Sequence, residues 1–225
     1  MKALPQPLAG VFLDLDGTVL DTALDLYGAL ESVCADDGVA PPAFDVLRQV
    51  VSRGSRAILA TAYPHDSSAR LIERMPGYLA RYERDIAVHT RPFDGMDEAL
   101  LALEERGVPW GIVTNKPGFL TDRLLAALKM DVRAASVVSG DTLPVKKPDP
   151  APVLLACERA GVDPARCLFV GDDRRDVEAG RAAGCYTVAV GWGYLDGGDP
   201  RTWGADLVVD TVAEFASVLG LSVHA

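Results

Sequence analysis

The feature that most constrains this chain is a series of short apolar segments, with longer stretches of helical periodicity between them. The segments are rich in Val and Ile and do not alternate with polar residues, which is typical of strands buried on both faces of a parallel sheet. They comprise residues 10–13, 110–113, 135–138, 167–170, 186–190 and 207–209. The helical stretches cover residues 96–106, 119–129, 150–160 and 173–183. Helices alternating with buried strands predict an open, Rossmann-like α/β fold with a parallel sheet.

One long section interrupts this alternation. Between residues 20 and 89 no segment has the pattern of a buried strand. Helical periodicity covers residues 22–37, 44–51, 56–62 and 67–85. The first of these helices begins at Thr22 with Asp25 three residues later, which fits a capping box. The sequence therefore predicts a core made of residues 1–19 and 90–225, and a helical cap, residues 20–89, inserted after the first strand.

The composition narrows the class of protein. Lys and Arg number 22 and Asp and Glu number 32, so the formal net charge is −10, and 49% of the residues are hydrophobic. A chain this apolar is expected to fold, and its negative charge argues against nonspecific nucleic-acid binding, which needs a basic face. No apolar run approaches the roughly 18 residues of a membrane span, and the first residues lack the apolar region of a signal peptide. We expect a cytoplasmic protein with neither a nucleic-acid nor a membrane partner.

The cysteines point to the same compartment. Cys34, Cys157, Cys167 and Cys185 lie in apolar helix or strand patterns, and no two of them form a C-x-x-C motif. We expect each to be a buried free thiol, as in a reducing cytoplasm.

Polar residues with chemical potential follow four of the predicted strands. In open α/β sheets, ligands bind beyond the carboxyl ends of the strands, so these residues are candidates for one site. They are Asp14 and Asp16, then Thr114 and Asn115, then Lys146 and Lys147, and finally Asp172, Asp173 and Asp176. Each motif alone could be a turn, a helix cap or a solvated surface feature, but four together at successive strand ends favour a functional site.

The residue types in this set suit phosphoryl transfer. Asp14, Asp16 and Asp172 would repel one another, and a bound hard cation such as Mg²⁺ relieves that repulsion with oxygen ligands. A carboxylate nucleophile can form an aspartyl phosphate, which splits one difficult displacement into two easier ones. Lys147 can neutralise phosphoryl charge, and the Thr114 hydroxyl can hold a phosphate oxygen. Asp16 is the candidate proton donor to the leaving oxygen.

The same residues resemble the motifs of the haloacid dehalogenase (HAD) superfamily, specifically its phosphatase branch. The stretch from Asp14 to Thr18 is similar to the first motif, Thr114 to the second, Lys147 with its following prolines to the third, and the stretch from Gly171 to Asp176 to the fourth. The resemblance covers essentially the whole chain. It implies a Rossmann-like core with a helical cap inserted after the first motif.

The resemblance also implies roles. Asp14 would be the nucleophile and Asp16 the acid/base. Mg²⁺ would be held by Asp14, the backbone carbonyl of Asp16, and Asp172. Lys147 is chosen over Lys146 because the family's lysine precedes a Pro-x-Pro element.

Two further acids have supporting roles under this resemblance. Asp173 stands where many relatives carry Ser, so it either joins the outer shell of the metal or caps the next helix. Asp176 is expected to orient Lys147 or a metal-bound water.

Asp16 also bears on the class of substrate. A halide leaves without a proton, so a second acid favours a phosphate ester, and the expected partner is a small phosphorylated metabolite. The core residues do not exclude a sugar phosphomutase, and a non-catalytic phosphate-binding module on the same scaffold remains an alternative. In the cap, Arg53 and Arg56 could meet a substrate carboxylate, with exposed surface arginines as the alternative.

Among the family's phosphatases, the chain resembles those acting on N-acetylmuramic acid 6-phosphate and on 2-phosphoglycolate. Residues 81–89, 114–117 and 203–210 are more similar to the former. Both esters carry a carboxylate, so the cap arginines do not separate them. We expect the amino sugar ester, with 2-phosphoglycolate as the alternative.

Overall fold

The computed structural model describes residues 3–221, and its centre is one parallel sheet. The strands are β1 (Gly10–Leu13), β4 (Trp110–Val113), β5 (Ser136–Val138), β6 (Cys167–Gly171), β7 (Tyr186–Val190) and β8 (Leu207–Val209). They lie in the order β5-β4-β1-β6-β7-β8, and all of their pairings are parallel. The predicted α/β fold is confirmed, because each apolar segment forms one strand of this sheet.

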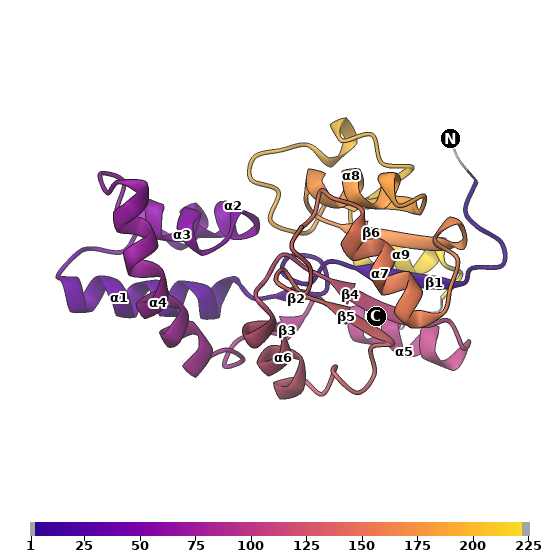
Figure 1. The fold of residues 1–225 in the computed structure, drawn as a ribbon, viewed down its shortest axis with the longest axis horizontal. Coiled ribbons are helices and arrows are strands. Elements are labelled where there is room, and N and C mark those ends of the chain that lie inside the picture. Colours follow the sequence, from indigo (N-terminus) through magenta and orange to yellow (C-terminus); the bar gives the residue numbers. More distant parts are fainter. Residues whose placement is uncertain (1–2, 222–225) are drawn as a thin grey trace.

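Helices cover both faces of the sheet (Figure 1). They are α5 (Met96–Glu105), α6 (Gly118–Ala127), α7 (Ala151–Ala160), α8 (Arg174–Ala182) and α9 (Val212–Val218), with short 3₁₀ turns at Pro164–Arg166 and Pro200–Thr202. Helices α7 and α8 pack on one face, and α5, α6 and α9 supply apolar side chains to the other.

The two faces follow from the alternation of side chains along β1. Phe12 packs in the cluster that contains α7 and α8, whereas Val11 and Leu13 pack in the cluster on the opposite face. All three side chains are fully buried. Burying both faces removes the whole strand from water, which explains why the sequence shows an unbroken apolar run rather than alternation.

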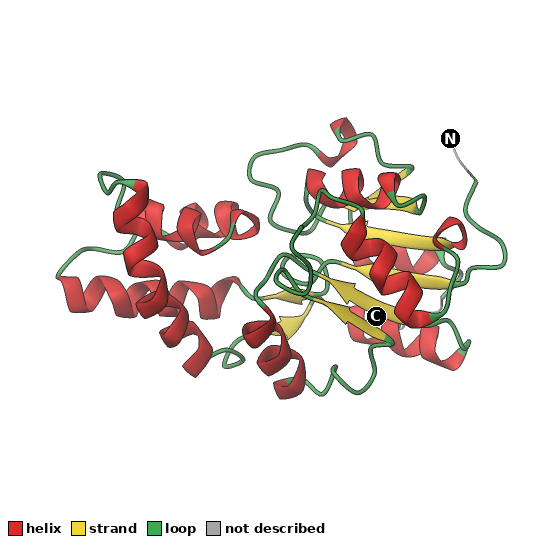
Figure 2. Cartoon of the chain, in the orientation of Figure 1, coloured by secondary structure: helices red, strands yellow, loops and turns green. Residues whose placement is uncertain are grey.

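The cap consists only of helices and extends from one side of the sheet (Figure 2). It contains α1 (Ala23–Asp37), α2 (Phe44–Val50), the 3₁₀ turn Val51–Arg53, α3 (Ser55–Ala62) and α4 (Ser68–Arg84). Helix α4 packs against α1 and α3. The fully buried Tyr78 of α4 donates a hydrogen bond to the carbonyl of Leu26 in α1, 3.1 Å away.

Two short strands connect the cap to the core and were not expected from the sequence. Strand β2 (Leu20–Asp21) pairs antiparallel with β3 (Arg91–Pro92). A two-residue strand is too short to produce a hydrophobic period. The prediction that residues 20–89 contain no strand was therefore wrong for residues 20 and 21. We propose that this ribbon marks the division between core and cap, close to the boundaries expected at residues 19/20 and 89/90.

The predicted capping box at the start of α1 is also absent. The Thr22 hydroxyl donates to Asp16, 2.7 Å away, instead of capping its own helix. Asp25 accepts hydrogen bonds from the backbone of His89 and Thr90 across the ribbon. The hydroxyl of Tyr194, in the loop after β7, accepts from the backbone N–H groups of Thr22 and Ala23. Hydrogen bonds to the core thus replace the local N-terminal capping of helix α1.

The four cysteines are buried and form no disulfide, as predicted. Within residues 3–221, no helix has the length and apolar character required to cross a membrane.

Candidate active site

Three adjacent strands bring the predicted catalytic residues to one edge of the sheet. Asp14 follows β1, Thr114 follows β4 and Asp172 follows β6, and β1 lies between the other two strands. The Asp14 N–H donates to the carbonyl of Val170 at 2.9 Å, and the Thr114 N–H donates to the carbonyl of Val138 at 2.9 Å. These bonds continue the sheet beyond its last residues and fix the backbone from which the functional side chains project.

An acidic cluster lies at this edge. Carboxylate oxygens of Asp14, Asp172 and Asp176 lie within 4.8 Å of one another, and all three residues are buried. Burial, followed by repulsion from Asp14 and Asp176, holds the pKa of Asp172 well above its usual range. Its carboxylate accepts hydrogen bonds from the Thr18 hydroxyl, at 3.1 Å, and from the backbone N–H of Tyr194, at 2.7 Å.

Glycine permits the close approach of the first loop to this cluster. Gly17 has a φ of 87°, and a Cβ built there would lie 2.1 Å from Oδ2 of Asp172. Only glycine accommodates both the backbone conformation and the contact. The Gly after the two acids of the first motif is therefore required by the position of the acid from β6.

Lys147 supplies the positive charge at the cluster. Its buried Nζ lies 2.6 Å from Oδ1 of Asp14, 2.7 Å from Oδ1 of Asp176 and 2.7 Å from the carbonyl of Val113. Lys146, the neighbour that the sequence could not fully exclude, has an exposed side chain without a hydrogen bond or ion pair to any described residue. Of the two lysines, the structure brings Lys147 to the acids.

Asn115 holds the backbone of Lys147. Its side-chain oxygen accepts from the N–H of Lys147 at 3.1 Å, and its amide nitrogen donates to the carbonyl of Lys147 at 3.0 Å. Asn115 was predicted to bind substrate. The structure places it on the wall of the cavity, but with its amide engaged in orienting the lysine loop.

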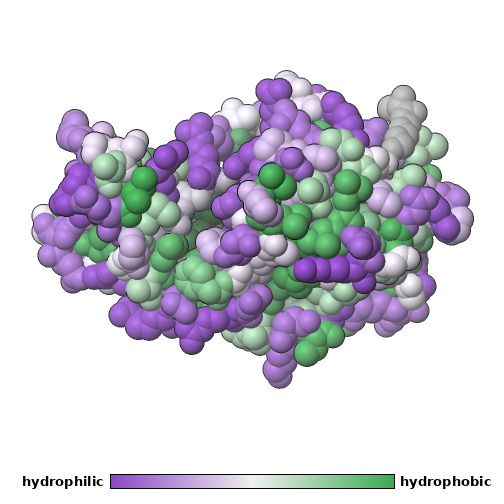
Figure 3. Space-filling model, in the orientation of Figure 1, coloured by the Kyte–Doolittle hydropathy of each residue, from purple (hydrophilic) through white to green (hydrophobic). Residues whose placement is uncertain are grey.

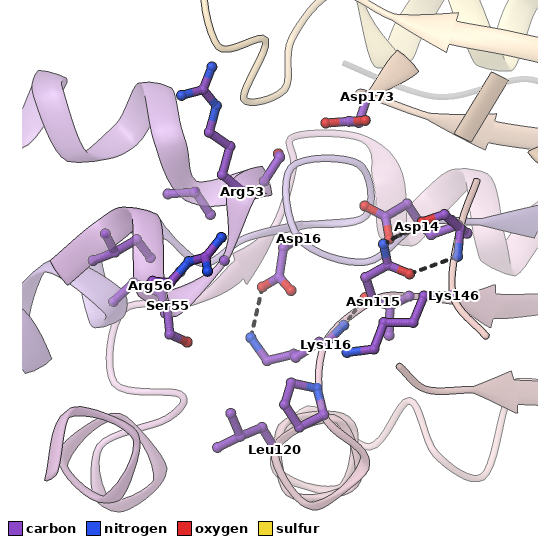
Figure 4. Close-up of a pocket in the computed structure, with 18 of the residues that line it drawn as sticks. Asp14, Asp16, Arg53, Ser55, Arg56, Asn115, Lys116, Leu120, Lys146 and Asp173 are labelled. Atoms are coloured by element: carbon purple, nitrogen blue, oxygen red, sulfur yellow. Dashed lines mark hydrogen bonds and ion pairs between the residues drawn. The ribbon is translucent and has the colours of Figure 1, made fainter. Parts of the chain in front are cut away.

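Asp16 lies apart from the acidic cluster (Figure 4). Its carboxylate accepts a hydrogen bond from the Thr22 hydroxyl and forms an ion pair with Nζ of Lys116 at 2.9 Å. Nζ of Lys116 also donates to the hydroxyl of Tyr82, from cap helix α4, at 2.9 Å. No role for Lys116 was predicted from the sequence, although its position two residues after Thr114 at a strand end was a usable signal.

The turn between α2 and α3 brings the cap against the acids. The Ser52 hydroxyl lies 3.3 Å from Oδ2 of Asp172, and the guanidinium of Arg175 donates to the Ser52 carbonyl at 2.6 Å. Arg53 also lines the cavity, and its guanidinium pairs with Asp196. Arg56 lines the cavity, and its side chain makes no hydrogen bond or ion pair with the described residues.

Asp173 takes the second of its two predicted roles. Its carboxylate accepts from the N–H of Arg175 and forms a capping box with Asp176 at the start of α8. Burial acts to raise its pKa, but the hydrogen bonds and charge of Arg175 hold the pKa of Asp173 below its usual value. Asp173 therefore caps the N-terminus of α8 and forms an ion pair with Arg175.

A cavity of about 320 Å³ lies between the cap and the core, and the recess it opens into is visible in Figure 3. Its lining includes Asp14, Asp16, Thr114 and Lys147 from the core and the turn around Arg53 and Arg56 from the cap. A phosphate ester in this cavity would have its phosphorus near Asp14 and its remaining atoms beneath the cap.

Sequence comparison relates the chain to hydrolases. Residues 11–190 match the family model described as haloacid dehalogenase-like hydrolase. The chain belongs to this family. The N-acetylmuramic acid 6-phosphate phosphatase of Pseudomonas putida is 42% identical over 214 residues, which cover 94% of this chain and 96% of that relative. A phosphoglycolate phosphatase of Xylella fastidiosa is 45% identical over 201 residues, covering 89% of this chain and 88% of that relative.

A solved structure agrees with the fold of this HAD-like hydrolase. The crystal structure of a predicted phosphoglycolate phosphatase from Haemophilus somnus matches with a TM-score of 0.84 at 24% identity, covering 94% of this chain and 98% of that one. The family and the named phosphatase relatives make the protein a hydrolase of phosphoric monoesters. That assignment favours a hydrolase over the mutase and the non-catalytic module that the residues alone left open.

Replacing Lys116 with Met should lower kcat of this phosphatase by about 10- to 100-fold, with a smaller change in KM. The ammonium that holds Asp16, the acid/base expected from the sequence, would be lost, and a small misplacement of a catalytic group costs up to about 100-fold. Steady-state phosphate release checks this result. Lys116→Arg should recover part of the rate, and Tyr82→Phe should cost less than Lys116→Met. A raised KM with unchanged kcat would instead make Lys116 a substrate ligand.

Proposed function

We propose that the protein is a Mg²⁺-dependent phosphatase that acts through an aspartyl phosphate on Asp14. The single observation that carries this proposal is the buried pairing of Asp14 with Lys147, 2.6 Å apart, at the shared end of three parallel strands. A carboxylate beside a buried ammonium presents a nucleophilic oxygen next to a charge that can neutralise phosphoryl oxygens.

The reaction has two displacements. A carboxylate oxygen of Asp14 attacks phosphorus, the bond from phosphorus to the ester oxygen breaks, and Asp16 gives its proton to the leaving oxygen. Asp16 then takes a proton from water, the water oxygen attacks phosphorus, and the bond to Asp14 breaks to release inorganic phosphate. Throughout, Lys147 holds the phosphoryl oxygens together with the Thr114 hydroxyl.

The acidic cluster fits a magnesium ion. Its donors are carboxylate oxygens, the ligands that Mg²⁺ prefers. Burial first, and then repulsion from Asp14 and Asp176, raises the pKa of Asp172, and a cation would relieve that repulsion. We propose Asp14 and Asp172 as side-chain ligands, with the backbone carbonyl of Asp16 as the third protein ligand. When bound, Mg²⁺ would supply positive charge to the phosphoryl oxygens. Asp176, which pairs with Lys147, has an orienting role.

N-acetylmuramic acid 6-phosphate is the proposed substrate, and 2-phosphoglycolate is the alternative. Relatives carrying each activity in their names are about equally similar to this chain, so the names do not decide. The cavity supports the larger ester, because its 320 Å³ extend from Asp14 to the cap helices. The protein would act in the cytoplasm, which suits four buried cysteines that form no disulfide.

The test compares phosphate release from the two esters at matched low concentrations, with Mg²⁺ or with a chelator in its place. We expect turnover only with Mg²⁺, and a higher kcat/KM for the amino sugar ester. A higher kcat/KM for 2-phosphoglycolate would establish the alternative substrate while keeping the chemistry. Undiminished turnover in chelator would contradict the metal requirement.

The cap arginines should differ in their effect on the proposed substrate. Arg56→Met should raise KM by about 10- to 100-fold, since a charge-assisted hydrogen bond contributes about 1.5–3 kcal/mol. Arg53→Met should change KM less, because Arg53 already pairs with Asp196. Initial rates over a range of ester concentrations measure both. Equal effects of the two substitutions would contradict the assignment of Arg56 as the ligand of the substrate carboxylate.

A further inference from the structure

One wall of the active-site cavity is apolar, and the reaction chemistry does not use it. Met75 and Leu79 from α4 and Leu120 from α6 line this wall, with Leu26 and Ile58 from the other cap helices. Leu26, Ile58 and Leu120 are at most 6% exposed, whereas Met75 and Leu79 are only partly buried. Met75 and Leu79 are therefore the side chains with surface left for a ligand.

Helix α4 places this apolar wall next to the residues of the reacting centre. Met75, Leu79 and Tyr82 are spaced four and three residues apart, so they share one face of the helix. The Tyr82 hydroxyl contacts Nζ of Lys116, and that ammonium pairs with Asp16. The apolar wall thus begins one helical turn before Tyr82, which is joined to the proposed proton donor Asp16 through Lys116. The alcohol part of an ester leaves from this side of the reacting centre.

Unpaired cations border the same cavity. Arg56 from the cap and Lys146 from the core both line it, and neither side chain has a hydrogen bond or ion pair among residues 3–221 (Figure 4). A leaving group that matches the cavity would carry an anionic group for these cations and an apolar group for the wall. The leaving group of 2-phosphoglycolate has the anionic group, a carboxylate, but no apolar group.

We propose that Met75 and Leu79, with Leu120, form a subsite for an apolar substituent of the leaving group, such as the methyl groups of an acyl or ether-linked side chain on a sugar phosphate. This inference rests on the proposed phosphatase function and makes α4 the element that selects among esters. Burying a methyl or methylene against such a wall contributes about 0.8 kcal/mol, so two such groups would separate substrates by about 10-fold. The subsite would act on kcat/KM for substituted sugar esters and leave unsubstituted esters unaffected.

The test uses three esters and variants of α4. N-acetylmuramic acid 6-phosphate carries acyl and ether substituents, and glucose 6-phosphate and 2-phosphoglycolate carry neither. Met75→Gln keeps the side-chain length and Leu79→Gln lengthens the side chain by one atom; both make the wall polar, and Leu79→Trp fills the space. Ile72→Gln is the matched control, because Ile72 is 55% exposed on the same helix and outside the cavity lining. Thermal melting of each variant confirms that it is folded.

We expect each cavity variant to lower kcat/KM for the muramic acid ester by about 10-fold and to change the other two esters less than twofold, with Ile72→Gln like wild type. Equal losses on all three esters, or no loss on any, would overturn the subsite while leaving the proposed substrate standing. If wild type itself prefers 2-phosphoglycolate, both the proposed substrate and the subsite are wrong, and only the core chemistry remains. If a variant does not fold, the two remaining variants decide.

Discussion

Replacing Asp14 with Asn should remove phosphate release almost entirely, lowering kcat by about 10⁴- to 10⁶-fold. The amide has nearly the shape of the carboxylate but lacks the charged oxygen that would attack phosphorus. Phosphate release at saturating ester with Mg²⁺ measures the loss. Because Asn occupies the same space between Lys147 and Asp172, the protein should fold normally.

The stability of the same variant separates a catalytic from a structural cause. Asp14 lies in a buried cluster with two other carboxylates, so removing its charge lessens repulsion within the cluster. Without Mg²⁺, the Tm of Asp14→Asn should equal or exceed that of wild type, and added Mg²⁺ should raise it less. Asp94→Asn is the control, because Asp94 is exposed and outside the cavity lining. Near-wild-type turnover by Asp14→Asn would contradict the proposed mechanism.

The fold was predictable because burial on both faces leaves a simple sequence signature. Strand β1 has the bounds expected from its apolar run, and α5 differs from its expected range by a single residue. Such elements need no knowledge of their neighbours, since an apolar run between helical stretches has few alternatives. Strand β2 was missed because its two residues are defined by pairing with β3, and the partners Leu20 and Pro92 are 72 positions apart in the sequence.

The candidate site was predictable where it depends on strand ends and unpredictable where it depends on distant contacts. Residues that follow adjacent parallel strands must meet, which brought Asp14, Thr114 and Asp172 together. In contrast, the contact of Lys116 with Tyr82 joins a core residue to cap helix α4, 34 positions away in the sequence. No periodicity encodes it, because it arises from how α4 packs over the core.

The start of α1 is a place where a local sequence pattern predicted a contact that the structure does not form. Thr22 and Asp25 have the spacing of a capping box, but both side chains form contacts across the cap–core connection instead. A core residue, Tyr194, accepts the hydrogen bonds from the first N–H groups of the helix. Local propensity was outweighed where tertiary partners were better placed, and those partners connect the cap to Asp16.

Replacing Lys147 with Met should lower kcat by about 10²- to 10³-fold, because the transferring phosphoryl group loses its buried positive charge. Lys146→Met is the matched control, since it changes the adjacent residue in the same way at an exposed position. The control should keep wild-type kcat, with any effect confined to KM because Lys146 borders the cavity, and it should change the free energy of unfolding by less than about 0.5 kcal/mol. If Lys146→Met lowered kcat as far as Lys147→Met, the assignment of the phosphate-binding lysine would be wrong.

The same substitution should also destabilise the fold, by about 3–5 kcal/mol, because Asp14 and Asp176 would be left without the ammonium they share. Burial already raises the pKa of Asp176 to about 7, against the lowering effect of Lys147. Without Lys147 the pKa of Asp176 in the folded state rises further, while in the unfolded chain it stays at its usual value. Between these two pKa values the folded state binds more protons than the unfolded chain. Unfolding free energy then falls as pH rises, and the deficit relative to wild type should be larger at pH 8 than at pH 5. Denaturant titration without Mg²⁺ at both pH values measures this, and an equal deficit at both would show that Asp176 is not the group left unpaired.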